Sequence, residues 1–363
     1  MKRSSFIGHV AWTGAGIAYV LGGDGIVRAA DAAPGQFSFV QISDSHIGYT
    51  GPANADVRAT LAQTVDDINA LAVQPAFVIH TGDVTHLSKA AEFDDARAIL
   101  GRLRAPLLAL PGEHDVIGTQ GMPRFAAAFG RKDAVGRGWS SWDQGGIHFV
   151  ALINVGEGET MGVLGDEQLT WLAADLAARK ADTPIVVFGH VPLFAVAPEW
   201  GWTTADGTKA IALLRRFYSV TVLNGHIHQI IEHRDGAIRF ATANATAFPQ
   251  AAPGTPGAKP GPLAVAPGSL LGVLGYRTVE VAGAATWQDI SLARACGPSK
   301  EARWRSKVPG SIMHTGRTRG GCARSPITCF TTATRRRTPC SRRCCACGAA
   351  GATMRSADRC CRF

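Results

Sequence analysis

Cysteine is absent from the first 295 residues, and all nine cysteines follow that point. A body without thiols has nothing that can mispair, so it suits an oxidising compartment. Long apolar runs are missing as well. Hydrophobic residues make up 46% of the chain, which is ample for a core. Beyond the N-terminal segment, however, no run reaches the roughly 20 residues needed to span a bilayer. We therefore expect no stable membrane span once that segment is removed.

Basic residues are scarce in the body of the chain, although the whole chain carries a net charge of +9. Residues 297–363 hold 15 of the 37 basic residues and 2 of the 28 acidic ones, a net +13. The remainder keeps 22 basic and 26 acidic residues, a net −4. A mildly acidic body lacks the broad basic surface of a nucleic-acid-binding domain, so we expect no nucleic-acid partner for it.

Residues 297–363 are rich in Arg, Cys, Ala, Gly and Thr and lack apolar periodicity. Three interpretations of this tail compete. A zinc module is one, but the "CCAC" stretch lacks paired histidines. A basic arm that binds nucleic acid is the second. We favour the third, a disordered tail translated from a GC-rich gene in a shifted reading frame, and assign it no function.

Residues 1–32 have the layout of a secretory signal peptide. Lys2 and Arg3 precede a modestly apolar, glycine-rich stretch over 6–21, and a small-residue cleavage pattern follows at 30–32. The "KRSSF" stretch loosely resembles a twin-arginine signal, so both the Sec and the Tat route remain open. We expect cleavage near Ala32 and a periplasmic or secreted protein, in preference to a retained anchor.

Apolar strands alternate with amphipathic helices over residues 33–296, which we interpret as one domain of the α/β class. A Pro/Gly/Ala-rich stretch at 247–269 is interpreted as a surface loop. Helices are predicted over 55–71, after an N-cap at Ser88, after a cap at Asp166, and through Ile211 and Phe217. Strands are predicted at 37–43, 76–80, 106–110, 147–153, 184–188, 220–223, 237–242 and 274–281.

Polar residues follow five of these strands, at the points where the strands end. Asp44 and His46 are two residues apart, and positions i and i+2 of an extended chain project to the same side. His226 and His228 repeat this spacing. Ligands of α/β folds bind at such strand ends. The five stretches read "SDSH", "TGDVTH", "PGEHD", "GHVP" and "NGHIH".

Each stretch alone is weak evidence, because Asp-x-His arises by chance and a strand-end histidine is more often structural than metal-bound. Five of them together indicate one metal site. Mixed Asp and His ligands suit manganese, iron or zinc, in contrast to thiolate-selected ions. His80 and His148 lie inside predicted strands and are expected to be structural.

In order and spacing, the series resembles the calcineurin-like metallophosphoesterases, whose pattern is Asp-x-His, Gly-Asp, Gly-Asn-His-Asp/Glu, Gly-His and Gly-His-x-His. The resemblance covers residues 37–282. Within the family, the series is similar to that of bacterial cyclic-nucleotide phosphodiesterases and phosphatases. The resemblance implies a four-layer α/β/β/α sandwich of two mixed β-sheets flanked by helices. The metal site would lie at the carboxyl ends of the strands.

The resemblance also implies two divalent or trivalent ions and a role for each motif. His114 would be the catalytic non-ligand that donates a proton to the departing oxygen or stabilises the transition state. It would act with a hydroxide that bridges the ions and attacks phosphorus. The implied metal ligands are Asp44, His46 and His228 for the first ion, His190, His226 and Glu113 for the second, and Asp83 between them.

Two positions depart from the family pattern. Glu113 stands where the family usually has a neutral Asn; we expect it to bind metal, the alternative being that it turns away and water replaces it. His86 stands where many relatives have an acidic residue, so we expect it to line the pocket or hydrogen-bond a metal ligand. Asp115 and Asn224 are the other residues expected to contact the substrate or to support the ligands.

Several tryptophans lie in loops after the motif-bearing segments. Their rings could stack on a base or contact an acyl chain, but we favour packing beneath the loops. These tryptophans are Trp139, Trp142, Trp200 and Trp202.

The leading functional hypothesis is an exported two-metal phosphoesterase acting on a small-molecule or lipid phosphate ester, either a diester or a monoester. One alternative is a non-catalytic metal-binding protein that retains the fold. The intact ligand set and His114 argue against it. Another is nucleic-acid binding through the basic tail, which would be sensitive to salt.

Overall fold

The computed structural model describes residues 11–12, 18–21, 27–29, 36–158, 161–282 and 285–294. The chain divides into two compact units, 1–304 and 305–363, and every described residue belongs to the first. The predicted tail therefore lies outside the described residues. Most of the predicted leader does too, and it stays a prediction. Three short antiparallel strands of its backbone are described: β1 (Ala11–Trp12), β2 (Ala18–Leu21) and β3 (Val27–Ala29).

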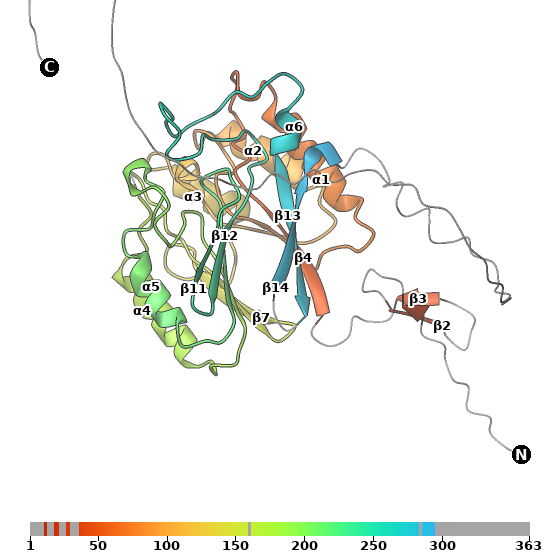
Figure 1. The fold of residues 1–363 in the computed structure, drawn as a ribbon, viewed down its shortest axis with the longest axis vertical. Helices are drawn as coiled ribbons and strands as arrows, with labels where there is room; N and C mark the ends of the chain where they lie inside the picture. The colour runs from red at the N-terminus through yellow and green to blue at the C-terminus, as the bar shows by residue number, and fades with distance from the viewer. Residues whose placement is uncertain are drawn as a thin grey trace, which may run out of the picture. The chain divides into compact units, whose positions relative to one another are not determined.

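Two mixed β-sheets form the centre of the domain (Figure 1). The six-stranded sheet has four parallel inner strands and an antiparallel strand at each edge. In the five-stranded sheet three neighbouring strands are parallel, and the two strands on one side of them are antiparallel. The five-stranded sheet has the order β14 (Ala285–Ser291), β13 (Gly275–Ala282), β4 (Gln36–Ile42), β5 (Val78–His80), β6 (Leu107–Ala109). The six-stranded sheet has the order β11 (Glu232–Asp235), β12 (Ile238–Thr242), β10 (Val220–Asn224), β9 (Ile185–Phe188), β8 (Ile147–Ala151), β7 (Ser140–Gln144).

Helices cover the outer face of each sheet. Apolar side chains of α1, α2 and α3 pack with those of β4 and β5 in one core cluster. Side chains of α4 and α5 pack against β8, β9 and β10 in another. The predicted four-layer α/β/β/α sandwich is therefore confirmed. The helices are α1 (Val57–Asn69), α2 (Ala90–Leu100), α3 (Gly121–Phe129), α4 (Asp166–Ala177), α5 (Gly207–Leu214) and the short α6 (Leu270–Val273).

An aromatic core fills the space between the two sheets. Phe39 and Phe77 stack at a centroid distance of 4.9 Å. Phe39 also meets Phe149 and Phe188 of the other sheet edge-on, at 5.8 and 5.7 Å. Burying such large rings contributes about 1.5–3 kcal/mol for each side chain. The interface therefore holds the strand ends of the two sheets in a fixed relation to each other.

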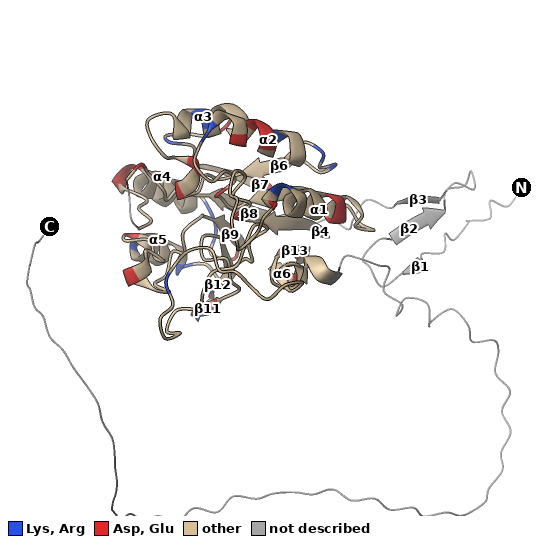
Figure 2. Cartoon of the chain, turned by 90° about the horizontal axis from the view of Figure 1, so that it is seen from above, with Lys and Arg blue, Asp and Glu red and all other residues tan. Residues whose placement is uncertain are grey.

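Acidic and basic residues are interspersed along α1 and α2 (Figure 2). Among the residues that the structure describes, no helix is long and apolar enough to cross a membrane.

All eight predicted strands are present, with bounds that differ by a few residues, but two predicted helix caps are wrong. Lys89 precedes α2, and Ser88 has a positive φ and donates its hydroxyl to the carbonyl of His114 instead. Gly165 precedes α4 with φ of 81°, so Asp166 is the first helical residue. β7, β11, β14 and α3 were not predicted.

The two in-strand histidines are structural, as predicted. His80 is fully buried, its Nε2 lies 2.8 Å from the hydroxyl of Ser45, and burial lowers its pKa to about 3. His148 is fully buried on β8, where its two ring nitrogens lie 2.9 and 2.7 Å from carboxylates of Asp143 and Asp175.

Candidate metal centre

The loops that follow the parallel strands of both sheets meet at one edge. The loop after β4 runs beside the loop after β5, where the amide of Asp44 donates to the carbonyl of Gly82 at 3.0 Å. The loop after β10 then joins from the other sheet, because the amide of His226 donates to the carboxylate of Asp44 at 3.1 and 3.2 Å. Residues 182 positions apart in the sequence are thus brought into contact.

Backbone strain is concentrated at these strand ends. Within the described ranges, the non-glycine residues with positive φ have values between 41° and 70°. Such conformations are unfavourable by about 1–3 kcal/mol each, and they persist where surrounding structure enforces them, often at functional sites. These residues are Asp44, His46, Asp83, Ser88, His226 and His228, and all but Ser88 are predicted ligands.

A first cluster of four buried side chains comprises Asp44, His46, Asp83 and His228. The Nε2 atoms of His46 and His228 lie 3.1 Å apart. Nε2 of His46 is 3.4 Å from Oδ2 of Asp83, and Nε2 of His228 is 3.5 Å from Oδ1 of Asp44. Two imidazoles and two carboxylates that converge at this spacing can surround one cation.

A second cluster comprises Glu113, His190 and His226. The carboxylate of Glu113 is turned into it: one oxygen lies 2.8 Å from Nε2 of His190 and the other 2.8 Å from Nδ1 of His226. Oδ1 of Asp83 lies 3.5 Å from Nε2 of His190. Asp83 therefore directs one oxygen to each cluster and is the candidate bridge between two ions.

The second cluster has the electrostatic properties of a cation site. Buried atoms that face one another there have no hydrogen-bond partner among the described residues: Oε2 of Glu113, Nε2 of His190, and both ring nitrogens of His226. Burial opposes protonation of His190, yet Asp83 and Glu113 outweigh it and raise its pKa well above the ordinary value. Such an excess of negative charge and free lone pairs fits bound cations, so the residues present suit the two ions implied by the resemblance.

Backbone carbonyls orient two of the candidate ligands. Nδ1 of His190 donates to the carbonyl of Thr81 at 2.7 Å, and Nδ1 of His228 donates to the carbonyl of Phe248 at 2.6 Å. Each bond keeps the proton on Nδ1 and leaves the lone pair of Nε2 directed at a cluster. Hydrogen bonds of this kind fix the tautomer of metal-binding histidines.

Glycine is required where two motif loops pass close to the ligands. A Cβ atom on Gly112 would collide with the carboxylate of Asp83, and one on Gly82 would collide with the ring of His190. Gly82 also has φ of 104°. These contacts explain why glycine precedes Glu113 and Asp83 in the sequence.

Asp115 and Asn224 lie behind the clusters, away from the open face. Asp115 is fully buried and accepts hydrogen bonds from Thr85, Val84 and Gly112, so it ties the loops after β5 and β6 together. Asn224 is also fully buried and donates to the carbonyls of the β9 loop at 2.9 and 3.1 Å. Of the two predicted roles, the structure favours support of the ligands over substrate contact.

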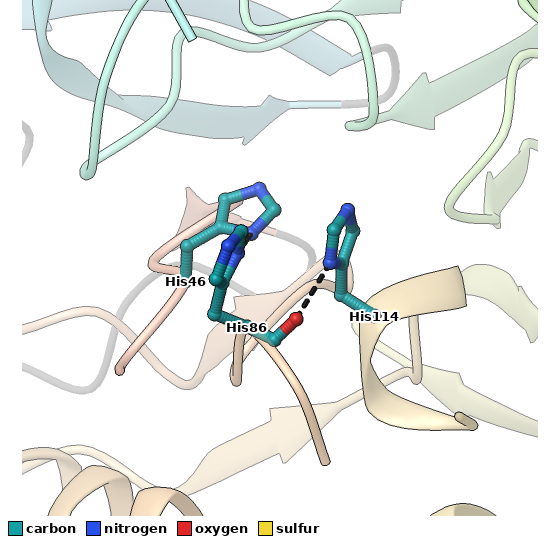
Figure 3. A group of neighbouring side chains, drawn as sticks. All are labelled: His46, His86 and His114. Atoms are coloured by element: carbon teal, nitrogen blue, oxygen red, sulfur yellow. Dashed lines mark hydrogen bonds between the residues drawn. The ribbon is translucent and has the colours of Figure 1, made fainter. Parts of the chain in front are cut away.

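His114 lies beside the two clusters, and His86 lies against it (Figure 3). The amide of His114 donates to Oδ1 of Asp83 at 2.9 Å, and its Nδ1 donates to the carbonyl of His86 at 2.7 Å. Burial alone would lower the pKa of His114, but the carboxylates of Asp83 and Glu113 raise it above its ordinary value. The predicted catalytic residue is thus held near the carboxylates by its own backbone.

A cavity of about 250 Å³ opens over the clusters. Its walls include His114, Phe248, and residues 260–262 of the loop that was predicted only as a surface loop. The sequence offers no motif that marks these wall residues. Trp139 and Trp202 are buried, as favoured for the tryptophans, and Trp200 is half-buried; both Trp200 and Trp202 line this cavity.

Comparisons with known proteins agree with this geometry. The sequence profile of the calcineurin-like phosphoesterase family matches residues 37–230. A glycerophosphodiester phosphodiesterase of Enterobacter lignolyticus is 29% identical over 196 residues, covering 53% of this chain and 69% of the relative. A probable cyclic nucleotide phosphodiesterase of Rhodopseudomonas palustris is 29% identical over 163 residues, covering 43% of this chain and 57% of the relative.

The fold is likewise similar to that of a solved structure, purple acid phosphatase from yellow lupin. The TM-score is 0.54 at 14% identity, over 77% of this chain and 57% of the phosphatase. The family match extends over more than half of this chain, from β4 to the second histidine pair. The chain therefore belongs to the calcineurin-like phosphoesterase family and is a metal-dependent hydrolase of phosphoric esters.

Proposed function

We propose that the protein is an exported phosphodiesterase that uses two metal ions, one in each cluster. The observation that carries the proposal is the convergence of the predicted ligands into two clusters that share Asp83. Manganese, iron and zinc all suit these nitrogen and oxygen donors. The substrate class is a small-molecule or lipid phosphate ester that reaches the cavity over the clusters.

The residues of the chain divide the work of hydrolysis. When bound, two cations supply Lewis acidity and make water a nucleophile at neutral pH. Asp83 and Glu113 would hold the cations, and His114 would supply a proton to the departing ester oxygen or stabilise the phosphoryl oxygens. His114 is held in this position by the hydrogen bond that its backbone amide donates to Oδ1 of Asp83.

Glu113 supports a preference for diesters. Asp44, Asp83 and Glu113 contribute three negative charges, whereas an Asn at position 113 would leave two. A more negative site attracts a dianionic phosphomonoester less than a monoanionic diester. At separations of about 4 Å, one unit charge changes an interaction by about 4 kcal/mol near a protein surface, so the effect can be large. The two sequence relatives described above are a glycerophosphodiester phosphodiesterase and a probable cyclic nucleotide phosphodiesterase, which is in line with this preference.

Glu113→Asn is expected to shift the ratio of diester to monoester hydrolysis toward the monoester by on the order of tenfold. The variant should also hold the second ion more weakly, because a charged ligand has been replaced by a neutral one. The measurement uses bis-p-nitrophenyl phosphate and p-nitrophenyl phosphate, with metal content determined on the same samples.

Glu113→Gln is the matched control, since it keeps the length of the side chain and removes its charge. If charge sets the preference, both variants shift the ratio in the same direction. An unchanged ratio and unchanged metal content in both variants would show that Glu113 does not set the preference.

The export part of the proposal rests on residues 1–32. Expression of the full chain in a bacterial host should yield periplasmic protein whose new N-terminus lies close to Ala32. N-terminal sequencing of the fractionated protein measures this. Replacement of Lys2 and Arg3 by Gln should reduce export, because the positive end of a signal peptide is needed for targeting. Cytoplasmic protein that begins at residue 1 would contradict the proposal.

A further inference from the structure

His86 occupies a junction between the first cluster and the catalytic histidine. Its loop runs beside the loop after β4, where the amide of His86 donates to the carbonyl of Ile47 at 2.9 Å. The side chain is half-buried and lines the cavity over the clusters. From this place it contacts both His46 and His114 (Figure 3).

The ring of His86 faces the far side of a candidate ligand. Nδ1 of His86 lies 3.3 Å from Nδ1 of His46, whose Nε2 faces Asp83 and His228. A neutral imidazole carries one proton and one lone pair. For Nε2 of His46 to offer its lone pair to a cation, its proton must be on Nδ1. Nδ1 of His86 must then accept that proton in a hydrogen bond.

The backbone of the same residue acts on His114. The carbonyl of His86 accepts a hydrogen bond from Nδ1 of His114 at 2.7 Å. The two rings stack at a centroid distance of 5.0 Å and an interplanar angle of 12°. With one proton held on Nδ1, the doubly protonated form of His114 can give its other proton, on Nε2, to a departing oxygen. Residue 86 therefore sets the proton positions of two neighbouring histidines.

We propose that His86 is a positioning residue: its ring holds His46 in the metal-binding tautomer, and its carbonyl holds the orientation of His114. The inference rests on the proposed function, because it assumes a cation in the first cluster. It extends that function by giving a role to the residue that replaces the family's acidic side chain.

A third cation among His46, His86 and His114 is the competing interpretation, since their ring nitrogens lie within 4.8 Å of one another. One observation disfavours it. His46 would have to lose both ring protons in order to bind one ion through each nitrogen. A hydrogen bond between Nδ1 of His46 and Nδ1 of His86 satisfies both atoms without that requirement.

Two variants of the full chain separate the ring nitrogen from the rest of the residue. His86→Phe keeps an aromatic ring against His114 and the backbone carbonyl but removes the acceptor. His86→Asn keeps a polar atom close to the position of Nδ1. His233→Ala is the control, because His233 is exposed on β11 and packs against Phe194, away from both clusters.

The primary readout is metal affinity, measured by competition with a chelator using manganese or zinc. His86→Phe should bind one of two ions about 10–100-fold more weakly, the usual effect of removing a partner of a metal-binding histidine. His86→Asn should recover most of the affinity, and His233→Ala should match the wild type. Thermal unfolding of each metal-free variant shows whether folding is intact.

The outcomes are distinguishable. Two ions bound by the wild type with equal affinity in His86→Phe would overturn the inference and leave the proposed function standing. Equal losses in the Phe and Asn variants would also overturn it, because the acceptor would not matter. Three ions in the wild type and two in His86→Phe would establish the third-cation site instead. A wild type that binds no ion would remove the proposed function itself.

Discussion

Replacement of Asp83 by Asn is expected to reduce hydrolysis by on the order of a thousandfold, because loss of metal-based charge stabilisation is worth several kcal/mol. The two oxygens of Asp83 face different clusters, at 3.4 Å from Nε2 of His46 and 3.5 Å from Nε2 of His190. Asn preserves size and one acceptor but removes the shared negative charge. Two cations without that charge repel each other more strongly.

The measurement combines metal content with hydrolysis of bis-p-nitrophenyl phosphate. Asp95→Asn provides a matched control, because Asp95 lies on α2 and pairs with Arg58 at the surface. The Asp83 variant should retain fewer ions than the control and lose activity. Full metal content with near-normal rates would mean that Asp83 does not bridge the clusters.

Replacement of His114 by Ala is expected to slow hydrolysis by about 10²–10⁴-fold while metal content stays unchanged. His114 lies beside both clusters, and its ring bonds to the carbonyl of His86. The hydrogen bond to Asp83 is donated by the backbone amide of residue 114, so it is kept in the Ala variant. The variant therefore removes a proton-transfer group and preserves the ligands.

The leaving group distinguishes the two roles considered for His114. A proton donor matters most when the departing alcohol is a poor leaving group, so an alkyl diester should lose more rate than a p-nitrophenyl diester. Equal losses would favour stabilisation of the phosphoryl oxygens. Loss of bound metal in His114→Ala would instead show that the residue is a metal ligand. An unchanged rate of hydrolysis would show that His114 takes no part in catalysis.

The positions of the candidate ligands could be predicted because they depend on strand order. The side chains of Asp44, Asp83, Glu113 and His190 come within a few residues of the end of a strand, and parallel strands bring their carboxyl ends to one edge. The apolar runs were long enough to identify eight of the eleven strands of the two sheets. The sandwich itself came from the resemblance, because alternation alone does not say how two sheets pack.

Other features have no local signal in the sequence. β7 and β11 are polar edge strands, so their apolar pattern is weak. The carbonyl that orients His228 belongs to Phe248, a residue 20 positions away, and any residue there has a carbonyl. The cap at Ser88 was wrong because its hydroxyl bonds to the loop of His114 rather than to α2. Tertiary contacts decided each of these outcomes.

His86 combines a feature that the sequence predicts with one that only tertiary contacts determine. The sequence marked it as a departure from the family pattern and left open whether it faces the pocket or a ligand. The structure places it at both, because its ring lines the cavity and its Nδ1 lies 3.3 Å from His46. Sequence spacing could not show which of these places His86 takes. The loops after β4 and β5 run side by side, and this brings His86 next to His46.

The most direct test of the account is a crystal structure of the metal-loaded full chain, with anomalous scattering recorded at the metal's absorption edge. The account predicts two peaks at the strand ends. One should be bound by Asp44, His46 and His228 and the other by Glu113, His190 and His226, with Asp83 contacting both. A single peak, or Glu113 turned away from the second ion, would contradict the assignment.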